Sequence, residues 1–285
     1  MPSRKAIKRR VASVKTTRQI VRAMDMVAGT KLQKIKKWIY AARPLAEEST
    51  RMLAQLKRCE QAAGHVFFKE REGKRALYVL LTSDRGLCGS YNTNISATTL
   101  RHMNKNALEE QIIAIGLRGK DYFTRREKRI LQSYSGMAET AFFEDARMIG
   151  KTLVSKFLSG EVDEVYVAYT HFVTVLTHEP RVVRVLPVGN QDEGPEDDNF
   201  GMKYGPDLMT VLDYAVPAYL NAFLYSAMLE SAASEQASRM ISMDAATKNA
   251  TEIIDDLTRL YNRKRQAYIT QEITEIIGGA EVSNS

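Results

Sequence analysis

Residues 7–32 read IKRRVASVKTTRQIVRAMDMVAGTKL, and apolar or small side chains recur in this stretch in alternating steps of four and three. This spacing is typical of a helix with a heptad seam. Gly29 is the only glycine before residue 60, and Pro44 is the only residue that interrupts the run. We therefore predict one helix from about residue 4 to about residue 58, with a bend near the proline and a length of about 80 Å. Its predicted seam comprises Ile7, Val11, Val14, Val21, Met24, Ala28, Leu32, Ile35, Ile39, Ala42, Leu45 and Leu53.

A second heptad seam follows Pro206 and Asp207, which form a good helix start. Pro217 lies near its beginning and predicts a kink or a restart, but no further glycine or proline occurs before Gly278. Alanine is frequent in this seam, so another backbone can approach closely, whereas an isolated helix would bury too little area to be stable. The two terminal helices are therefore predicted to pair as an antiparallel, left-handed coiled coil.

The register of this pair follows from counting along both helices. If residue 58 lies opposite residue 210, Ile7 lies opposite residue 261, and about twenty residues of the second helix extend past the first. The extension carries four isoleucines that the first helix cannot cover, so we expect another protein to surround them: Ile269, Ile273, Ile276 and Ile277.

The middle of the chain, residues 75–190, predicts an α/β layer domain. Apolar segments that read as strands alternate with helical stretches near 91–104, 118–127 and 144–158, and the last two strands follow one another directly. This order predicts a Rossmann-like domain with a mainly parallel five-stranded sheet and one antiparallel edge. The predicted strands are 76–82, 111–117, 129–135, 164–170 and 181–188. The predicted domains are a coiled-coil helix at 1–60, the α/β domain at 75–190, an acidic loop at 191–207, a coiled-coil helix with its tip at 208–278 and a tail at 279–285.

The net charge of +7 is unevenly distributed. Residues 1–60 contain 16 Lys and Arg residues against four acidic residues, which gives +12 and leaves −5 for the rest. A basic segment of this kind indicates nucleic acid, an anionic membrane surface or an acidic protein partner, and charge alone does not choose among them. No apolar run approaches the roughly 20 residues needed to cross a bilayer.

No catalytic, cofactor or metal site is predicted. The loop SDRGLCGSYN (83–92) follows a strand and precedes a helix, but it lacks the lysine of a Walker loop and the pattern GxGxxG. Gly150-Lys151-Thr152 reads as the middle of a helix. The four histidines have no metal-like spacing, and Cys59 and Cys88 have no partner that indicates a disulfide or zinc.

Four longer stretches resemble the γ subunit of the F-type ATP synthase. They are IKRRVASVKTTRQIVRAMDMVAGTKL (7–32), TSDRGLCGSYN (82–92), SEQASRMISMDAATKNA (234–250) and YNRKRQAYITQEITEIIGGA (261–280). The order and spacing of these stretches agree with that family over the whole chain.

The resemblance implies a central rotor shaft that is itself non-catalytic. In that family the coiled coil stands inside a ring of three α and three β subunits, while the α/β domain rests on the c-subunit ring and holds the ε subunit. Rotation of the ring, driven by ions, changes the nucleotide affinity of each β subunit in turn, so ATP synthesis is coupled to transport. Nucleotides bind to α and β, and the resemblance therefore implies no cofactor and no direct nucleotide binding here. It also implies a peripheral location on the cytoplasmic face of the bacterial plasma membrane, with attachment only through the complex.

The resemblance also implies three sets of contact residues. The set that matches contacts with β subunits is Met24, Arg85, Arg265, Gln266, Thr270 and Gln271. Ile273, Ile276 and Ile277 match the tip that sits in the upper bearing of the collar. The foot on the c ring is matched less well, by Lys203, Tyr204 and Asp207.

The competing hypothesis is a coiled-coil adaptor, or a structural protein bound to nucleic acid, with an α/β head. Against nucleic acid, the seam is occupied by the partner helix, and no aromatic platform accompanies the basic residues. We therefore expect an acidic protein collar as the partner and no nucleic acid.

Overall fold

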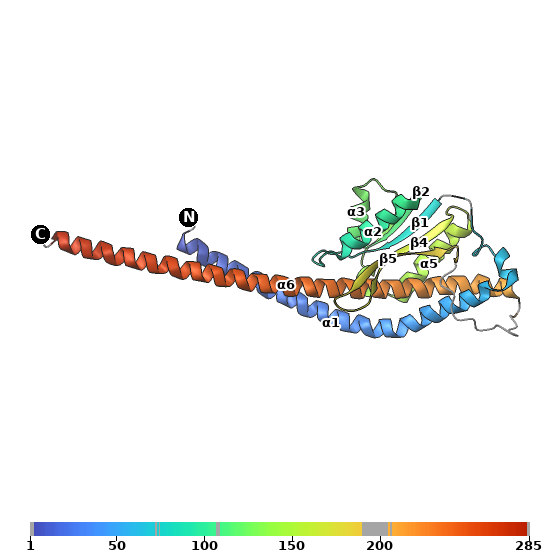
Figure 1. Ribbon diagram of the computed structural model, residues 1–285, viewed down its shortest axis with the longest axis horizontal. Coiled ribbons are helices and arrows are strands. Elements are labelled where there is room, and N and C mark those ends of the chain that lie inside the picture. Colours follow the sequence, from blue (N-terminus) through green and yellow to red (C-terminus); the bar gives the residue numbers. More distant parts are fainter. Residues whose placement is uncertain are drawn as a thin grey trace. The chain divides into compact units, whose positions relative to one another are not determined.

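The computed structural model describes residues 3–71, 73, 75–106, 109–189, 205 and 207–283. Two long helices, α1 and α6, precede and follow a region of alternating strands and helices along the chain (Figure 1). In chain order the elements are α1 (Arg4–Lys57), the 3-10 helix η1 (Glu60–Gly64), β1 (Arg75–Leu81), α2 (Tyr91–Asn106), β2 (Glu109–Ile115), α3 (Leu117–Thr124), β3 (Ile130–Tyr134), α4 (Met137–Thr140), α5 (Phe143–Leu158), β4 (Glu164–Phe172), β5 (His178–Leu186) and α6 (Leu208–Ser283).

The chain divides into two compact units, and the boundary falls within both long helices. The terminal unit comprises Met1–Ala28 and Met240–Ser285, and the central unit comprises Gly29–Arg239.

The central unit contains a five-stranded sheet in the order β3-β2-β1-β4-β5. The pairs among β1, β2, β3 and β4 are parallel, whereas β5 pairs antiparallel with β4 at one edge. Almost every residue of β1 is buried, as expected for a central strand covered on both faces. The predicted fold class, α/β with long terminal helices and a mainly parallel five-stranded sheet, is confirmed.

The two faces of the sheet pack against different helices. Tyr78 and Tyr166 stack at 4.9 Å between ring centroids, in a core that α2 completes through Ile95 and Met103. On the opposite face, the Tyr169 ring meets Phe223 of α6 edge to face. Alternate residues of one strand therefore serve two different interfaces, as the pleat requires.

Within the central unit, α5 also packs closely on α6. A Cβ atom added to Gly150 would lie 2.2 Å from the Asn221 side-chain oxygen, so a larger residue at this position would have to displace the Asn221 side chain. The stretch Gly150-Lys151-Thr152 lies inside α5, as predicted, and forms no phosphate-binding loop.

In each unit the α1 and α6 segments run antiparallel. In the terminal unit, Arg18 donates to the Thr251 hydroxyl at 3.5 Å, and Arg4 lies over the Tyr268 ring at 5.3 Å. The predicted register placed residue 250 opposite Arg18 and residue 264 opposite Arg4, so the prediction is correct to within about one helical turn. In the central unit, Arg43 pairs with Glu230.

Parts of the predicted seams are wrong. Leu45 was predicted to be buried but is 55% exposed, and the neighbouring Ala46 is buried instead. The seam therefore passes through Ala46 rather than Leu45, and it reaches Leu53, seven residues later, which is buried as predicted, while α1 continues through Pro44. In the second seam the heptad spacing predicts that Ile253 is buried, but Ile253 is 46% exposed and the neighbouring Ile254 is buried instead.

Several predicted boundaries also differ from the structure. Helix α6 does not restart at Pro217, and it continues past Gly278 to Ser283. Strand β5 begins at His178, three residues before its predicted start. Strand β2 ends at Ile115 because Gly116 adopts a φ of 96° at a point where a Cβ would lie 2.2 Å from the Thr82 carbonyl oxygen.

Candidate functional site

Within the central unit, residues 230–239 of α6 form a buried stretch that is rich in polar and charged side chains, here called the α6 polar segment. Every residue from 227 to 239 is buried, including several that carry polar or charged side chains. Buried polar groups are costly unless they are hydrogen-bonded, so their partners identify what this part of the helix does. The polar and charged members are Glu230, Ser231, Ser234, Glu235, Gln236, Ser238 and Arg239.

Two serines of this segment bind the end of β4. The Ser231 hydroxyl accepts from the Thr170 backbone N–H at 3.1 Å, and the Ser234 hydroxyl donates to the Thr170 carbonyl at 3.3 Å. One strand residue is thereby attached to α6 through both of its backbone polar groups. Serines one helical turn apart lie on the same face of α6, which explains why this pair can serve one residue.

Glu230 joins three elements at the same edge. Its carboxylate, only 6% exposed, pairs with Arg43 of α1 at 3.1 Å and with His171 Nδ1 of β4. Arg43 also donates to the Phe172 carbonyl at 3.3 Å. Two helices and the end of a strand therefore meet on a single buried carboxylate.

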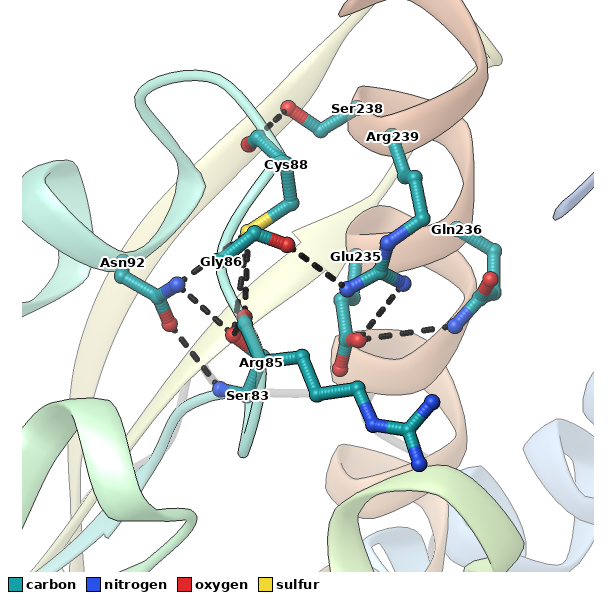
Figure 2. Close-up of polar contacts among 9 residues, drawn as sticks. All are labelled: Ser83, Arg85, Gly86, Cys88, Asn92, Glu235, Gln236, Ser238 and Arg239. Carbon is teal, nitrogen blue, oxygen red and sulfur yellow. Dashed lines mark hydrogen bonds and ion pairs between the residues drawn. The ribbon is translucent and has the colours of Figure 1, made fainter. Parts of the chain in front are cut away.

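The β1–α2 loop, residues 82–90, lies on the next turns of α6. Ser238 donates to the Cys88 carbonyl at 2.7 Å, and Arg239 Nη2 donates to the Gly86 carbonyl at 3.4 Å (Figure 2). The other amino nitrogen of Arg239 lies 2.8 Å from the Glu235 carboxylate, and both side chains are more than 90% buried. Two carbonyl groups of the loop are thus held by side chains of α6.

The same loop is fixed to the sheet by its first residues. Asp84 accepts from the Leu117 N–H at 3.1 Å and from the Gly136 N–H at 2.8 Å, through different carboxylate oxygens. Asn92 accepts from the Ser83 N–H at 2.9 Å and donates to the Ser83 hydroxyl at 2.7 Å. Asp84 therefore links the loop to the segments that follow β2 and β3.

The electrostatics of the loop do not favour nucleophilic chemistry. Burial raises the pKa of the Cys88 thiol, and the hydrogen bond from Ser83 only partly opposes this shift. Burial also raises the pKa of Tyr91 far above its ordinary value, and the Glu235 charge adds to the effect. Both groups therefore stay neutral at physiological pH, and the loop serves as a structural contact.

The predicted contact residues lie in both units. Arg85 is exposed on the β1–α2 loop of the central unit. Met24 is half-buried on α1 in the terminal unit, where α6 carries the remaining predicted β-contact residues, all exposed: Arg265, Gln266, Thr270 and Gln271. The Thr270 hydroxyl donates to the Gln266 carbonyl one turn earlier, at 3.0 Å.

The predicted tip and foot residues differ in how much of them the structure describes. Ile273, Ile276 and Ile277 are 51%, 68% and 56% exposed on the terminal unit. Asp207 accepts from the Thr210 backbone N–H at 2.9 Å and so caps the first turn of α6. Lys203 and Tyr204 lie outside the described residues.

Sequence reasoning assigned no role to the α6 polar segment. The heptad pattern reads its alanines as a close-packing seam, and the charged residues between them would ordinarily face solvent. The usable signal was the presence of Ser, Glu, Gln and Arg on every side of a helix that has no glycine or proline nearby.

Within the described part of the chain, no group of three or more His, Cys, Asp or Glu side chains could hold a metal ion. None of the described helices combines the length and apolar character needed to span a membrane.

Comparisons with known proteins identify the family. A family model described as ATP synthase matches residues 3–282. The ATP synthase gamma chain of Desulforamulus reducens is 41% identical over 283 residues, covering 98% of this chain and 99% of the relative. A gamma chain described as sodium ion specific, from Acetobacterium woodii, is 37% identical and covers 98% of both chains.

Solved structures support the fold. A chain of the Euglena gracilis mitochondrial ATP synthase, in a structure titled OSCP/F1/c-ring, aligns with a TM-score of 0.68 at 18% identity, covering 98% of this chain and 94% of that one. A chain of the Tetrahymena thermophila central stalk and c-ring aligns with a TM-score of 0.62 at 23% identity, over 80% of this chain and 99% of that one. The family model and the relatives extend over nearly the whole sequence, and the chain belongs to the ATP synthase γ-chain family.

Proposed function

We propose that this chain is the central rotor shaft of an ATP synthase, which couples ion-driven rotation to ATP synthesis and hydrolysis on other subunits. The observation that carries the proposal is the full-length similarity to ATP synthase gamma chains. The continuity of α6 over 76 residues supports it, because one helix supplies residues to both compact units. We assign the chain no catalytic, cofactor-binding or metal-binding residue.

We propose that the two units have different partners. The terminal unit enters a collar of three α and three β subunits, while the central unit contacts the ε subunit and the c ring and reaches a β subunit through Arg85. In this assignment Ile273, Ile276 and Ile277 sit in an apolar bearing, which accounts for their exposure in the isolated chain. The domain organisation predicted from the sequence, with the α/β domain at 75–190 between helices at 1–60 and 208–278, fits this division of partners.

The contacts with β subunits are assigned to Met24, Arg85, Arg265, Gln266, Thr270 and Gln271. Most of these side chains are exposed and polar, which suits contacts that form and break as a shaft turns. Asp207, with Lys203 and Tyr204, is assigned to the foot on the c ring. We propose no direct nucleotide or nucleic-acid binding, and we place the chain on the cytoplasmic face of the bacterial plasma membrane, held there through the complex.

The basic N-terminal helix supports an acidic partner. Lys8, Arg9 and Arg10 are exposed on α1, whereas Ile7 beside them is buried. We propose that these charges seat the helix against acidic levers of the β subunits. Replacing all three by glutamine should weaken assembly and reduce its salt dependence, and an unchanged salt dependence would remove the electrostatic part of the proposal.

Reconstitution with the cognate α and β subunits tests the main proposal. We expect a complex with three α, three β and one copy of this chain, with ATPase activity that requires the chain. ATP-driven rotation of a probe attached to the α/β domain provides the second measurement. A chain that leaves the α and β subunits unassembled and their ATPase activity unchanged would show that the proposal is wrong.

A further inference from the structure

We infer that the buried Glu235–Arg239 pair, together with Ser238, positions Arg85 for its contact with a β subunit. This inference rests on the proposed function, because it concerns how one of the proposed contact residues is held. Glu235, Ser238 and Arg239 are positioning residues, since they act through the loop.

The residues on either side of Arg85 are both held by hydrogen bonds. The preceding residue, Asp84, is bound through its side chain to the Leu117 and Gly136 N–H groups. The carbonyl of the following residue, Gly86, accepts from Arg239 of α6. Arg85 therefore lies between a residue bound to the segments that follow β2 and β3 and a residue bound to α6. Its own side chain extends from the loop and is exposed (Figure 2). A side chain presented in this way needs little reordering when it binds, which lowers the entropic cost of the contact.

The geometry of the ion pair explains why charged residues occupy this site. Glu235 and Arg239 are one turn apart on α6, so Glu235 can hold one amino nitrogen of Arg239 at 2.8 Å. The second amino nitrogen is thereby aimed at the Gly86 carbonyl. Ser238 fixes the Cys88 carbonyl two residues further along the loop. The planar guanidinium is the side-chain group that can bridge two acceptors in a fixed orientation.

A buried ion pair of this kind is weak evidence for stability. Removing one partner leaves an uncompensated buried charge, whereas replacing both partners by apolar residues of similar volume is often neutral. This asymmetry separates a positioning role from a merely structural one. The double variant E235L/R239M should keep the fold and its stability but lose the bond to Gly86. The single variants should be destabilised, because each leaves one buried charge without its partner.

Thiol reactivity of Cys88 reports directly on the loop. Cys88 is 1% exposed, and its carbonyl is the acceptor for Ser238. Cys59 is half-buried and is first replaced by serine, so that Cys88 alone is measured. In the full chain, the reaction rate of Cys88 with a disulfide reagent should rise by about tenfold or more in E235L/R239M and in S238A, because local opening becomes easier. The control is R51M, which removes an exposed ion pair with Glu48 on α1 and should leave the rate unchanged.

The functional arm uses ATP synthase reconstituted in vesicles. The ratio of ion transport to ATP hydrolysis should fall in E235L/R239M by a factor similar to that in R85A. The triple variant R85A/E235L/R239M should be no worse than R85A, because residues that act through one another are not additive.

The outcomes of the two arms are distinct. Additive losses, or an unchanged Cys88 rate in the double variant, would overturn the positioning role. A coupling defect in R85A without one in E235L/R239M would refute the inference while leaving the function of Arg85 intact. A chain whose R85A variant couples normally would refute both the assigned contact of Arg85 and the inference built on it.

Discussion

Replacing Glu230 by glutamine should lower the free energy of unfolding by about 2 to 3 kcal/mol. Glu230 is buried and pairs with Arg43 and His171, so the change removes a charge at the point where α1, α6 and β4 meet. A hydrogen bond to a charged group contributes about 1.5 to 3 kcal/mol, and breaking a buried pair costs about 3 to 5 kcal/mol. We expect the smaller of these two costs because Arg43 is 35% exposed and can be partly solvated when its partner is neutral.

A double-mutant cycle measures the interaction itself. The variants R43M, E230Q and their combination would be unfolded in urea, with the fluorescence of the single tryptophan, Trp38, as the probe. The coupling energy should be at least about 1.5 kcal/mol, which exceeds the scatter of additive sites.

The matched control is an exposed pair on the same helix in the same unit. Arg51 and Glu48 lie 2.6 Å apart, but their side chains are 57% and 64% exposed. Their cycle should give about 0 to 0.5 kcal/mol, because exposed pairs are screened by water and lose side-chain entropy. Equal coupling energies in the two cycles would refute the reasoning, since burial would then have no influence on the strength of the pair.

Three further changes act on other parts of the chain. The pKa of Asp163 is lowered by its hydrogen bonds with Arg75, so its contribution to stability is present above the unfolded pKa of about 3.9 and is lost as pH falls through the folded value. Asp163→Asn should therefore destabilise the protein at pH 7 and flatten the fall in stability below pH of about 4, measured by urea unfolding across pH. Truncation after Thr274 should leave the melting temperature unchanged and reduce the helical circular dichroism only by the residues removed from the end of α6. It should weaken assembly with α and β subunits, and a truncated chain that cannot fold would contradict this. Met24→Lys adds a charge on a half-buried position of α1 and should reduce coupling in reconstituted membranes more than it reduces stability.

The architecture was predictable because its signals are periodic and local. Ile35 and Ile39 recur at helical spacing and are buried. The alternation of apolar strands with helices along the chain predicted a mainly parallel sheet, which the structure contains. The error at Leu45 arose from choosing the larger apolar residue, because Ala46 continues the alternating steps of four and three after Ile39 and Ala42 and is the residue that is buried.

The candidate site shows a different limit of sequence reasoning. The stretch SDRGLCGSYN was read as a loop between a strand and a helix, but nothing local indicates that Gly86 and Cys88 are bound by residues about 150 positions later. The burial of Glu235 and Arg239 is likewise a tertiary effect, since side chains on all faces of a helix become buried only when several elements surround it. Hydrogen bonds between residues that are far apart in the sequence produce no periodic pattern of residue types, so sequence spacing cannot predict them.

The polar character of α6 at this site solves a problem that an alanine seam creates. A heptad of small residues packs almost equally well after a slip of one repeat, because each repeat presents a similar surface. Hydrogen bonds, in contrast, are directional. Ser231 and Ser234 bond to the backbone of Thr170, and Ser238 bonds to the Cys88 carbonyl, so each serine has its partner at one position of α6 along the sheet. A slip along the helix would leave these groups buried and unpaired, at a cost of about 1 to 3 kcal/mol for each one. The serines thus fix the α/β layer at one position on α6 while remaining small enough for close packing, and a shaft that transmits torque requires such an attachment.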